Sequence, residues 1–218
     1  MGMIARRALL LTGAAVLTRQ TARAAPAVPA GNTLAFRVMR HGSSIGTHVL
    51  AFRDNGDTLE VDITADVVVR FGPIPFVRYV HHAREYWRGD RLIGVTGHTN
   101  RNGKTLRMEA QWTTGGLAVD GSGTKPYIAP ENALATTYWN PRMLLGPMIG
   151  TQDGMLVHPA VSQHAADPIR LASGAQIPAR YCRLSGDLDL ELWYDASNTW
   201  AGMRFDADDG STITFERL

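Results

Sequence analysis

Hydrophobic side chains recur at every second position over long stretches of this chain. In LEVDITADVVVRF, residues 59–71, apolar side chains occupy the odd positions and polar ones most of the even positions. Successive side chains of a β-strand point to opposite faces, so this period of two predicts strands that each bury one face. DLDLELWYD, residues 187–195, has the same pattern and predicts that its leucines and Tyr194 point inward. The chain is therefore expected to be mainly β.

Turn signals divide the sequence into short runs. They are dipeptides that supply the positive φ angles of tight hairpins: Asn55-Gly56, Asn102-Gly103, Gly115-Gly116, Asp153-Gly154, Ser185-Gly186 and Asp209-Gly210. Between Leu34 and Leu218 the runs give about ten to twelve candidate strands. They predict a single domain over 33–218, an antiparallel meander that forms a curved sheet or a barrel around a ligand cavity.

The N-terminal residues are typical of an export signal. Arg6 and Arg7 precede an apolar run that is about half the length needed to cross a bilayer, and Ala22-Arg23-Ala24 is a small-x-small cleavage pattern. The Arg-Arg-Ala-Leu-Leu stretch resembles a twin-arginine signal. We expect cleavage near Ala24, a linker over 25–32, a periplasmic location and no transmembrane segment in the mature chain.

Removal of this signal changes the charge of the chain. Four of the 22 basic residues and none of the 20 acidic ones lie in residues 1–24, so the remaining 194 residues carry 18 basic and 20 acidic side chains. With that balance, the overall charge of the chain gives no electrostatic support for a nucleic-acid or an anionic-membrane partner. Cys182 is the one cysteine of the sequence, so an internal disulfide is excluded.

The segment around residues 130–149 differs from the rest of the chain. It contains the best helix candidate, interrupted by Pro141, and it is rich in aromatic residues and methionine. Long connections often act as lids or binding loops. The segment either caps the core or caps it and also binds an apolar ligand; the ligand-binding candidates are Tyr138, Trp139, Asn140 and Met143.

Two adjacent histidines stand out in FVRYVHHAREYW, residues 76–87. If this run is a strand, His81 and His82 point to opposite faces and cannot chelate one metal ion together. We consider His82, Arg84 and Tyr86 as candidate acid–base and anion-positioning residues, which requires that their face of the strand points inward. The alternative is a long strand that carries two structural imidazoles.

Other motifs predict no chemistry. The sequence has no GxSxG nucleophile elbow, no metal-binding histidine spacing and no glycine-rich phosphate loop. Ser43-Ser44 near His41 fits a hairpin loop, and Cys182 fits a small buried residue. We therefore predict no catalytic residues, no metal and no cofactor. The turn in RFGPIPFVRYV, residues 70–80, is unusually apolar, which suits contact with a ligand, a partner or a membrane surface, or folding back on the core.

Three short motifs carry a resemblance to a known family. IGTH at 45–48, Tyr-Trp-Asn at 138–140 and LSGDLDLELWYD at 184–195 resemble exported bacterial proteins that are grouped as a domain of unknown function. That family is similar to curved-sheet periplasmic proteins of the lipoprotein-carrier type. The resemblance implies a β fold and brings no catalytic residues.

These observations lead to three functional hypotheses. The first is a periplasmic β domain that binds an apolar or amphiphilic small molecule or lipid without catalysis. The second is a cofactor-free enzyme with a His/Arg/Tyr pocket. The third is a structural or interaction protein of the cell envelope.

Overall fold

The computed structural model describes residues 28–71, 74–164 and 166–218. The predicted signal at 1–24 and part of the linker lie outside these ranges, as do Gly72 and Pro73 of the apolar turn. Within the described ranges, no helix is long and apolar enough to cross a membrane.

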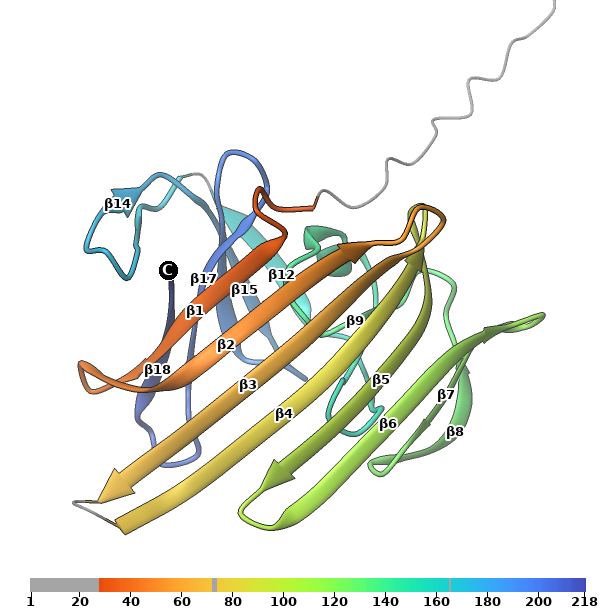
Figure 1. The fold of residues 1–218 in the computed structure, drawn as a ribbon, viewed down its shortest axis with the longest axis horizontal. Helices are drawn as coiled ribbons and strands as arrows, with labels where there is room; N and C mark the ends of the chain where they lie inside the picture. The colour runs from red at the N-terminus through yellow and green to blue at the C-terminus, as the bar shows by residue number, and fades with distance from the viewer. Residues whose placement is uncertain (1–27, 72–73, 165) are drawn as a thin grey trace, which may run out of the picture.

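Thirteen strands form one antiparallel sheet that curves round on itself without closing (Figure 1). The first eight follow one another as hairpins: β1 (Thr33–Arg40), β2 (Ser43–Asp54), β3 (Leu59–Phe71), β4 (Ile74–Arg88), β5 (Arg91–Arg101), β6 (Lys104–Thr113), β7 (Gly116–Gly121) and β8 (Thr124–Ala129). The others are β12 (Ala160–His164), β15 (Arg180–Ser185), β16 (Leu190–Tyr194), β17 (Trp200–Asp206) and β18 (Thr212–Arg217). Because β18 pairs with β1, the two halves of the meander are joined, and β8 and β12 are the outer strands.

The period of two in the sequence is also found in the structure. On β3, Val61, Ile63 and Ala65 are buried, whereas Asp62 is half-buried and Thr64 is exposed. The predicted mainly β meander is confirmed, with thirteen strands in its sheet. Asn102 and Gly103 both have positive φ, as the turn between β5 and β6 requires.

A segment between β8 and β12 fills the inner face of the sheet. We call residues 134–157 the plug. It consists of β9 (Leu134–Ala135), a 3-10 helix η1 (Pro141–Leu145), β10 (Met148–Ile149) and β11 (Leu156–Val157). The three strands form a small sheet of their own. The helix-or-loop segment predicted around 130–149 is thus confirmed, and Met143, Met148 and Ile149 are buried in the main core.

A small hairpin covers part of the outer face. It is formed by β13 (Ile169–Arg170) and β14 (Gln176–Ile177). Ile169 and Ile177 pack against a second buried cluster that includes Trp193 of β16 and Ala201 of β17. This hairpin explains why Trp193 is buried although Leu192 and Tyr194, on the other face of β16, line the main core.

Candidate functional site

A buried carboxylate on β4 joins the sheet to the plug. Glu85 has no solvent exposure. Its Oε2 accepts hydrogen bonds from the indole nitrogens of Trp87, at 2.8 Å, and Trp139, at 2.7 Å. Its Oε1 accepts one from Thr137 Oγ1 at 2.5 Å. Burial raises the pKa of Glu85, and these hydrogen bonds offset that effect only in part.

Aromatic rings surround this carboxylate. Trp139 lies edge-on to both Phe52 and Trp87, with ring centroids 5.1 and 5.6 Å apart. Two indole N–H groups in such an apolar setting need an acceptor, because an unpaired buried donor is costly. Glu85 supplies that acceptor to one tryptophan of the sheet and one of the plug.

A buried histidine forms the second contact between sheet and plug. The Nδ1 atom of His81 lies 2.8 Å from Thr99 Oγ1 on β5. Its Nε2 atom lies 3.3 Å from Thr151 Oγ1 in the plug. Burial, together with the charge of neighbouring His82, lowers the pKa of His81 to about 4. The ring is therefore neutral at neutral pH and is held by two hydroxyl groups.

A third buried imidazole belongs to β2. His48 is packed among the rings of Phe36, Trp200 and Phe215. Its Nε2 atom has no hydrogen-bond partner among the residues that the structure describes. Burial, with a smaller contribution from His81, lowers the pKa of His48 to about 3.

Two glycines let the plug backbone lie directly on the sheet. A Cβ atom at Gly97 of β5 would lie 1.8 Å from the carbonyl oxygen of Thr151. A Cβ at Gly121 of β7 would lie 2.1 Å from the carbonyl oxygen of Asp153. The plug is therefore seated in one defined position.

The ligand-binding candidates of the plug lie together in the structure. Trp139, Asn140 and Met143 are buried between plug and sheet, and Tyr138 is partly buried. Tyr138 has a φ of 65°, a costly conformation for a bulky residue. Its carbonyl oxygen accepts a 2.7 Å hydrogen bond from the hydroxyl group of Tyr194.

The other candidate group lies on the opposite face of β4. His82 is exposed, and Arg84 is largely exposed and forms an ion pair with Asp62, at 2.6 Å. Tyr86 is half-buried on the same side. The expectation that His82 points inward is therefore wrong, because alternation places His81 on the buried face. The inward-facing His82 that the enzyme hypothesis requires is not present.

Glu85 and His81 were not predicted as inward-facing residues, although the pattern of the neighbouring strand indicates their orientation. In the register of β3 with β4, Val61 lies opposite Glu85 and Ile63 opposite Ala83. Directly paired residues share a face of the sheet. The strongly apolar odd positions of β3 therefore indicate that Glu85 and His81 also point inward.

Cys182 is buried, and burial raises the pKa of its thiol. Within the described ranges, no group of three or more His, Cys, Asp or Glu residues is placed to hold a metal ion.

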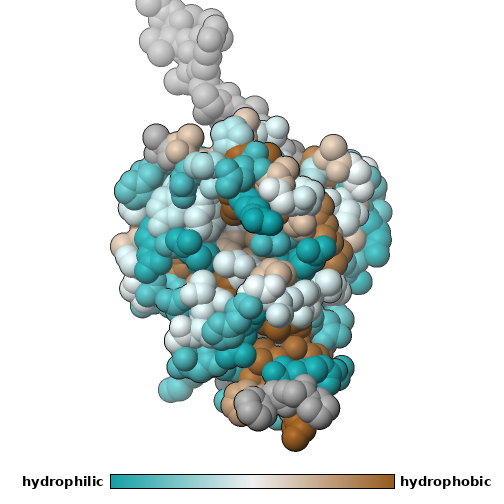
Figure 2. Space-filling model, turned by 90° about the vertical axis from the view of Figure 1, so that its left-hand side faces the viewer, coloured by the Kyte–Doolittle hydropathy of each residue, from teal (hydrophilic) through white to brown (hydrophobic). Residues whose placement is uncertain are grey.

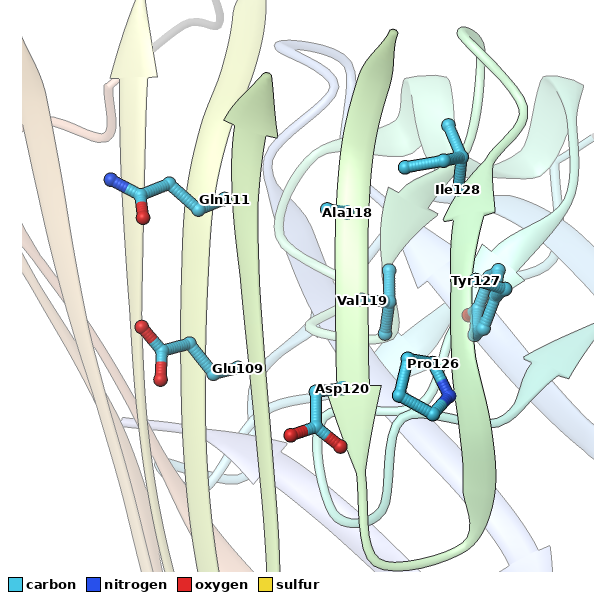
Figure 3. Close-up of a pocket in the computed structure, with 8 residues that line it drawn as sticks. All are labelled: Glu109, Gln111, Ala118, Val119, Asp120, Pro126, Tyr127 and Ile128. Atoms are coloured by element: carbon cyan, nitrogen blue, oxygen red, sulfur yellow. The ribbon is translucent and has the colours of Figure 1, made fainter.

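The surface of the described residues includes two openings of note. One has a volume of about 400 Å³ and is bordered by Glu109 and Gln111 of β6 and by residues of β7 and β8 (Figure 3). The other, of about 130 Å³, lies at the rim of the plug beside Arg91, Leu92, Arg142 and Leu145. The second gives solvent access next to η1.

The fold and these contacts define an open, barrel-like β domain with an internal plug. The chain belongs to the family described as domain of unknown function DUF6134, which matches residues 36–218. No curated protein sequence gave a match.

Solved structures with similarity to this chain include two from bacteria. The crystal structure of a β-barrel-like protein of domain of unknown function DUF1849 from Brucella abortus has a TM-score of 0.58 and 11% identity, and the match covers 90% of this chain and 97% of that one. A DUF1089 family protein from Pseudomonas aeruginosa has a TM-score of 0.29 and 14% identity, with coverage of 94% and 95%. At this level of identity, the first match supports the fold alone.

Proposed function

We propose that this protein is an exported binding domain that takes up an apolar or amphiphilic molecule on the inner face of its sheet, in place of the plug. The observation that carries the proposal is the way the plug is held. It occupies the apolar inner face, yet buried polar groups, Glu85 and His81, fix it there. The predicted export signal supports a location in the envelope, where lipids are available.

The plug can leave without dismantling the main sheet. Its strands pair with one another: Met148 with Leu134 of β9 and with Val157 of β11. A backbone hydrogen bond from Gly123 N to Asp153 O connects it to the β7–β8 turn. When a ligand displaces the plug, apolar contacts between plug and sheet are replaced by apolar contacts between ligand and sheet. The hydrogen-bond ladders of the thirteen strands stay intact.

The polar contacts favour a reversible arrangement over a permanent one. A buried carboxyl group and imidazole stabilise a core less well than apolar residues of the same shape. Their directional bonds hold one plug position and depend on protonation. The positive φ of Tyr138 adds a further cost to the seated plug, and such strain is typical of segments that switch.

The rim opening is the place where a ligand first contacts the protein. Leu145 is 73% exposed beside it, and Arg91 and Arg142 border it. Arg142 forms a 3.7 Å ion pair with Asp90, and Arg91 lies over the ring of Trp112. Arg91 also lies 4.0 Å from Glu131, so each guanidinium group of the opening has a carboxylate partner. An amphiphilic molecule with a polar head suits this combination of ion pairs and an exposed leucine.

Ligand binding can be tested with palmitate and with a lysophospholipid of the same chain length. If the plug must leave, weakening its contacts raises the apparent affinity, because the binding-competent fraction grows. We expect the double variant Thr137→Val/Thr151→Val, which removes hydroxyl contacts to Glu85 and His81, to bind palmitate or the lysophospholipid at least about fivefold more tightly than the unmodified chain.

Two controls accompany this variant. Thr64→Val lies on the outer face of β3 and should not change the affinity. Ile213→Val destabilises the core by about 1 kcal/mol without touching these contacts, so it separates plug release from general loosening. Unchanged affinity in the Thr137/Thr151 variant, or binding of neither probe by any of the proteins, would contradict the proposal.

A further inference from the structure

The hairpin of β3 and β4 extends beyond both neighbouring strands. β3 pairs with β2 only as far as Val67, opposite Gly46, although β3 continues to Phe71. β4 pairs with β5 from Tyr79, opposite Arg101, although β4 begins at Ile74. The end of the hairpin therefore protrudes from the sheet. We use the name hairpin tip for Ile74 and Phe76, together with Arg78 at their base.

The hairpin tip is apolar where a polar surface is expected. Ile74 is 65% exposed and Phe76 is 70% exposed. Figure 2 shows hydrophobic surface at this lower end of the molecule. The register of β4 shifts between Val77, opposite Val69, and Pro75, opposite Arg70, so Phe76 is the extra residue of a bulge. A bulge re-aims a side chain and interrupts pairing, which presents Phe76 outward.

Basic side chains lie beside these apolar ones. Arg78 and Lys104 are exposed, and neither has an ion-pair partner among the described residues. The β5–β6 turn that carries Lys104 is tied to β4, because Arg78 N donates to Asn102 Oδ1 at 2.7 Å. Of the acidic groups in this region, Asp208 forms a 2.6 Å ion pair with Arg101. Asp66 of β3 lies opposite Val80, two residues along β4 from Arg78. The end of the hairpin thus presents two exposed apolar side chains and Arg78, and Lys104 follows two strands away, opposite Arg101 of β5.

We propose that the hairpin tip inserts Ile74 and Phe76 into the surface of an anionic membrane, with Arg78 and Lys104 at the level of the lipid headgroups. Two protruding side chains offer far less area than the roughly 800 Å² that each partner buries in a typical protein interface. A membrane surface requires only a small apolar wedge, and each nearby cation adds about 1 kcal/mol of attraction to anionic lipid. The resulting contact is weak and reversible.

This proposal does not depend on the proposed ligand, because it concerns a different surface and a different readout. The test is flotation of the purified chain from residue 25 onwards, without the predicted signal, with phosphatidylcholine vesicles that contain or lack phosphatidylglycerol. We expect binding to the anionic vesicles, reduced about tenfold by Ile74→Ser/Phe76→Ser. Arg78→Gln/Lys104→Gln should reduce binding and flatten its dependence on salt.

A matched control comes from another exposed apolar residue. Ile128 of β8 is 53% exposed and lies away from the hairpin, so Ile128→Ser should bind the vesicles like the unmodified chain. The substituted side chains are all exposed, so the variants should keep their stability within about 0.5 kcal/mol. Failure to bind anionic vesicles, or equal binding by the Ile74/Phe76 variant, would overturn the proposal. So would a dimer that this variant converts to monomers, because the tip would then be an interface between copies.

Discussion

The Oε2 atom of Glu85 accepts a 2.7 Å hydrogen bond from the indole nitrogen of Trp139, which lies 54 residues further along the chain. The same oxygen accepts a bond from Trp87, so one buried carboxyl oxygen joins a tryptophan of the sheet to a tryptophan of the plug. We expect the seating of the plug to depend on this acceptor.

Substitution of Glu85 tests the acceptor directly. Glu85→Gln keeps a carbonyl oxygen for the two indole nitrogens and an amide near Thr137, and we expect it to cost at most about 1 kcal/mol. Glu85→Leu leaves both indole N–H groups unpaired, at a cost of about 2–4 kcal/mol. Urea unfolding followed by circular dichroism measures both. Equal stability of the two variants would show that the acceptor is unimportant.

Gly97 tests the close approach of the plug. A methyl group at this position meets the carbonyl oxygen of Thr151 at 1.8 Å, so Gly97→Ala should lower the unfolding free energy by about 3 kcal/mol or detach the plug. At Gly94, on the same strand, the nearest atom is 3.4 Å away. Gly94→Ala is therefore the control and should cost less than about 1 kcal/mol. Thermal unfolding with amide exchange of the plug distinguishes a local from a global effect.

The buried histidines predict a loss of stability in acid. The pKa values of His81 and His48 fall from 6.5 to about 4 and about 3 on folding. The unfolded chain therefore binds protons that the folded chain excludes, and stability decreases as the pH falls from 6.5 towards these values, by up to about 1.4 kcal/mol per pH unit and histidine. Glu85 has the opposite effect on stability. Its pKa is raised on folding, so it stabilises the folded chain below pH 4.5, and this contribution is lost as the pH rises. Urea midpoints across this range should fall with the pH; a constant midpoint would contradict the burial of the imidazoles.

His48 also predicts a stabilising substitution. Its Nε2 atom is buried without a partner among the described residues, and aromatic rings surround it. His48→Phe removes the unpaired nitrogen and should leave stability unchanged or raise it by about 1 kcal/mol at neutral pH. The variant should also lose part of the acid sensitivity. A fall of several kcal/mol, measured by urea unfolding, would indicate a polar contact that His48 must keep.

Much of the fold could be predicted from local pattern, but the inner site could not. The period of two on β3 and the Asn102-Gly103 turn are local signals, because each follows from backbone geometry over a few residues. Glu85 and Trp139 meet only through tertiary packing, and nothing in either local sequence indicates their contact. The two faces of β4 also look alike in sequence: one carries His82 and Tyr86, and the other carries His81 and Ala83. Only the pairing with β3 shows which face is buried.

The central claim is that the plug is a displaceable occupant of the inner face. Amide hydrogen exchange with and without saturating palmitate tests it most directly. The account predicts faster exchange in residues 134–157 when palmitate is bound, with β3, β4 and β5 still protected. Bound palmitate with unchanged or slower exchange in the plug would contradict it.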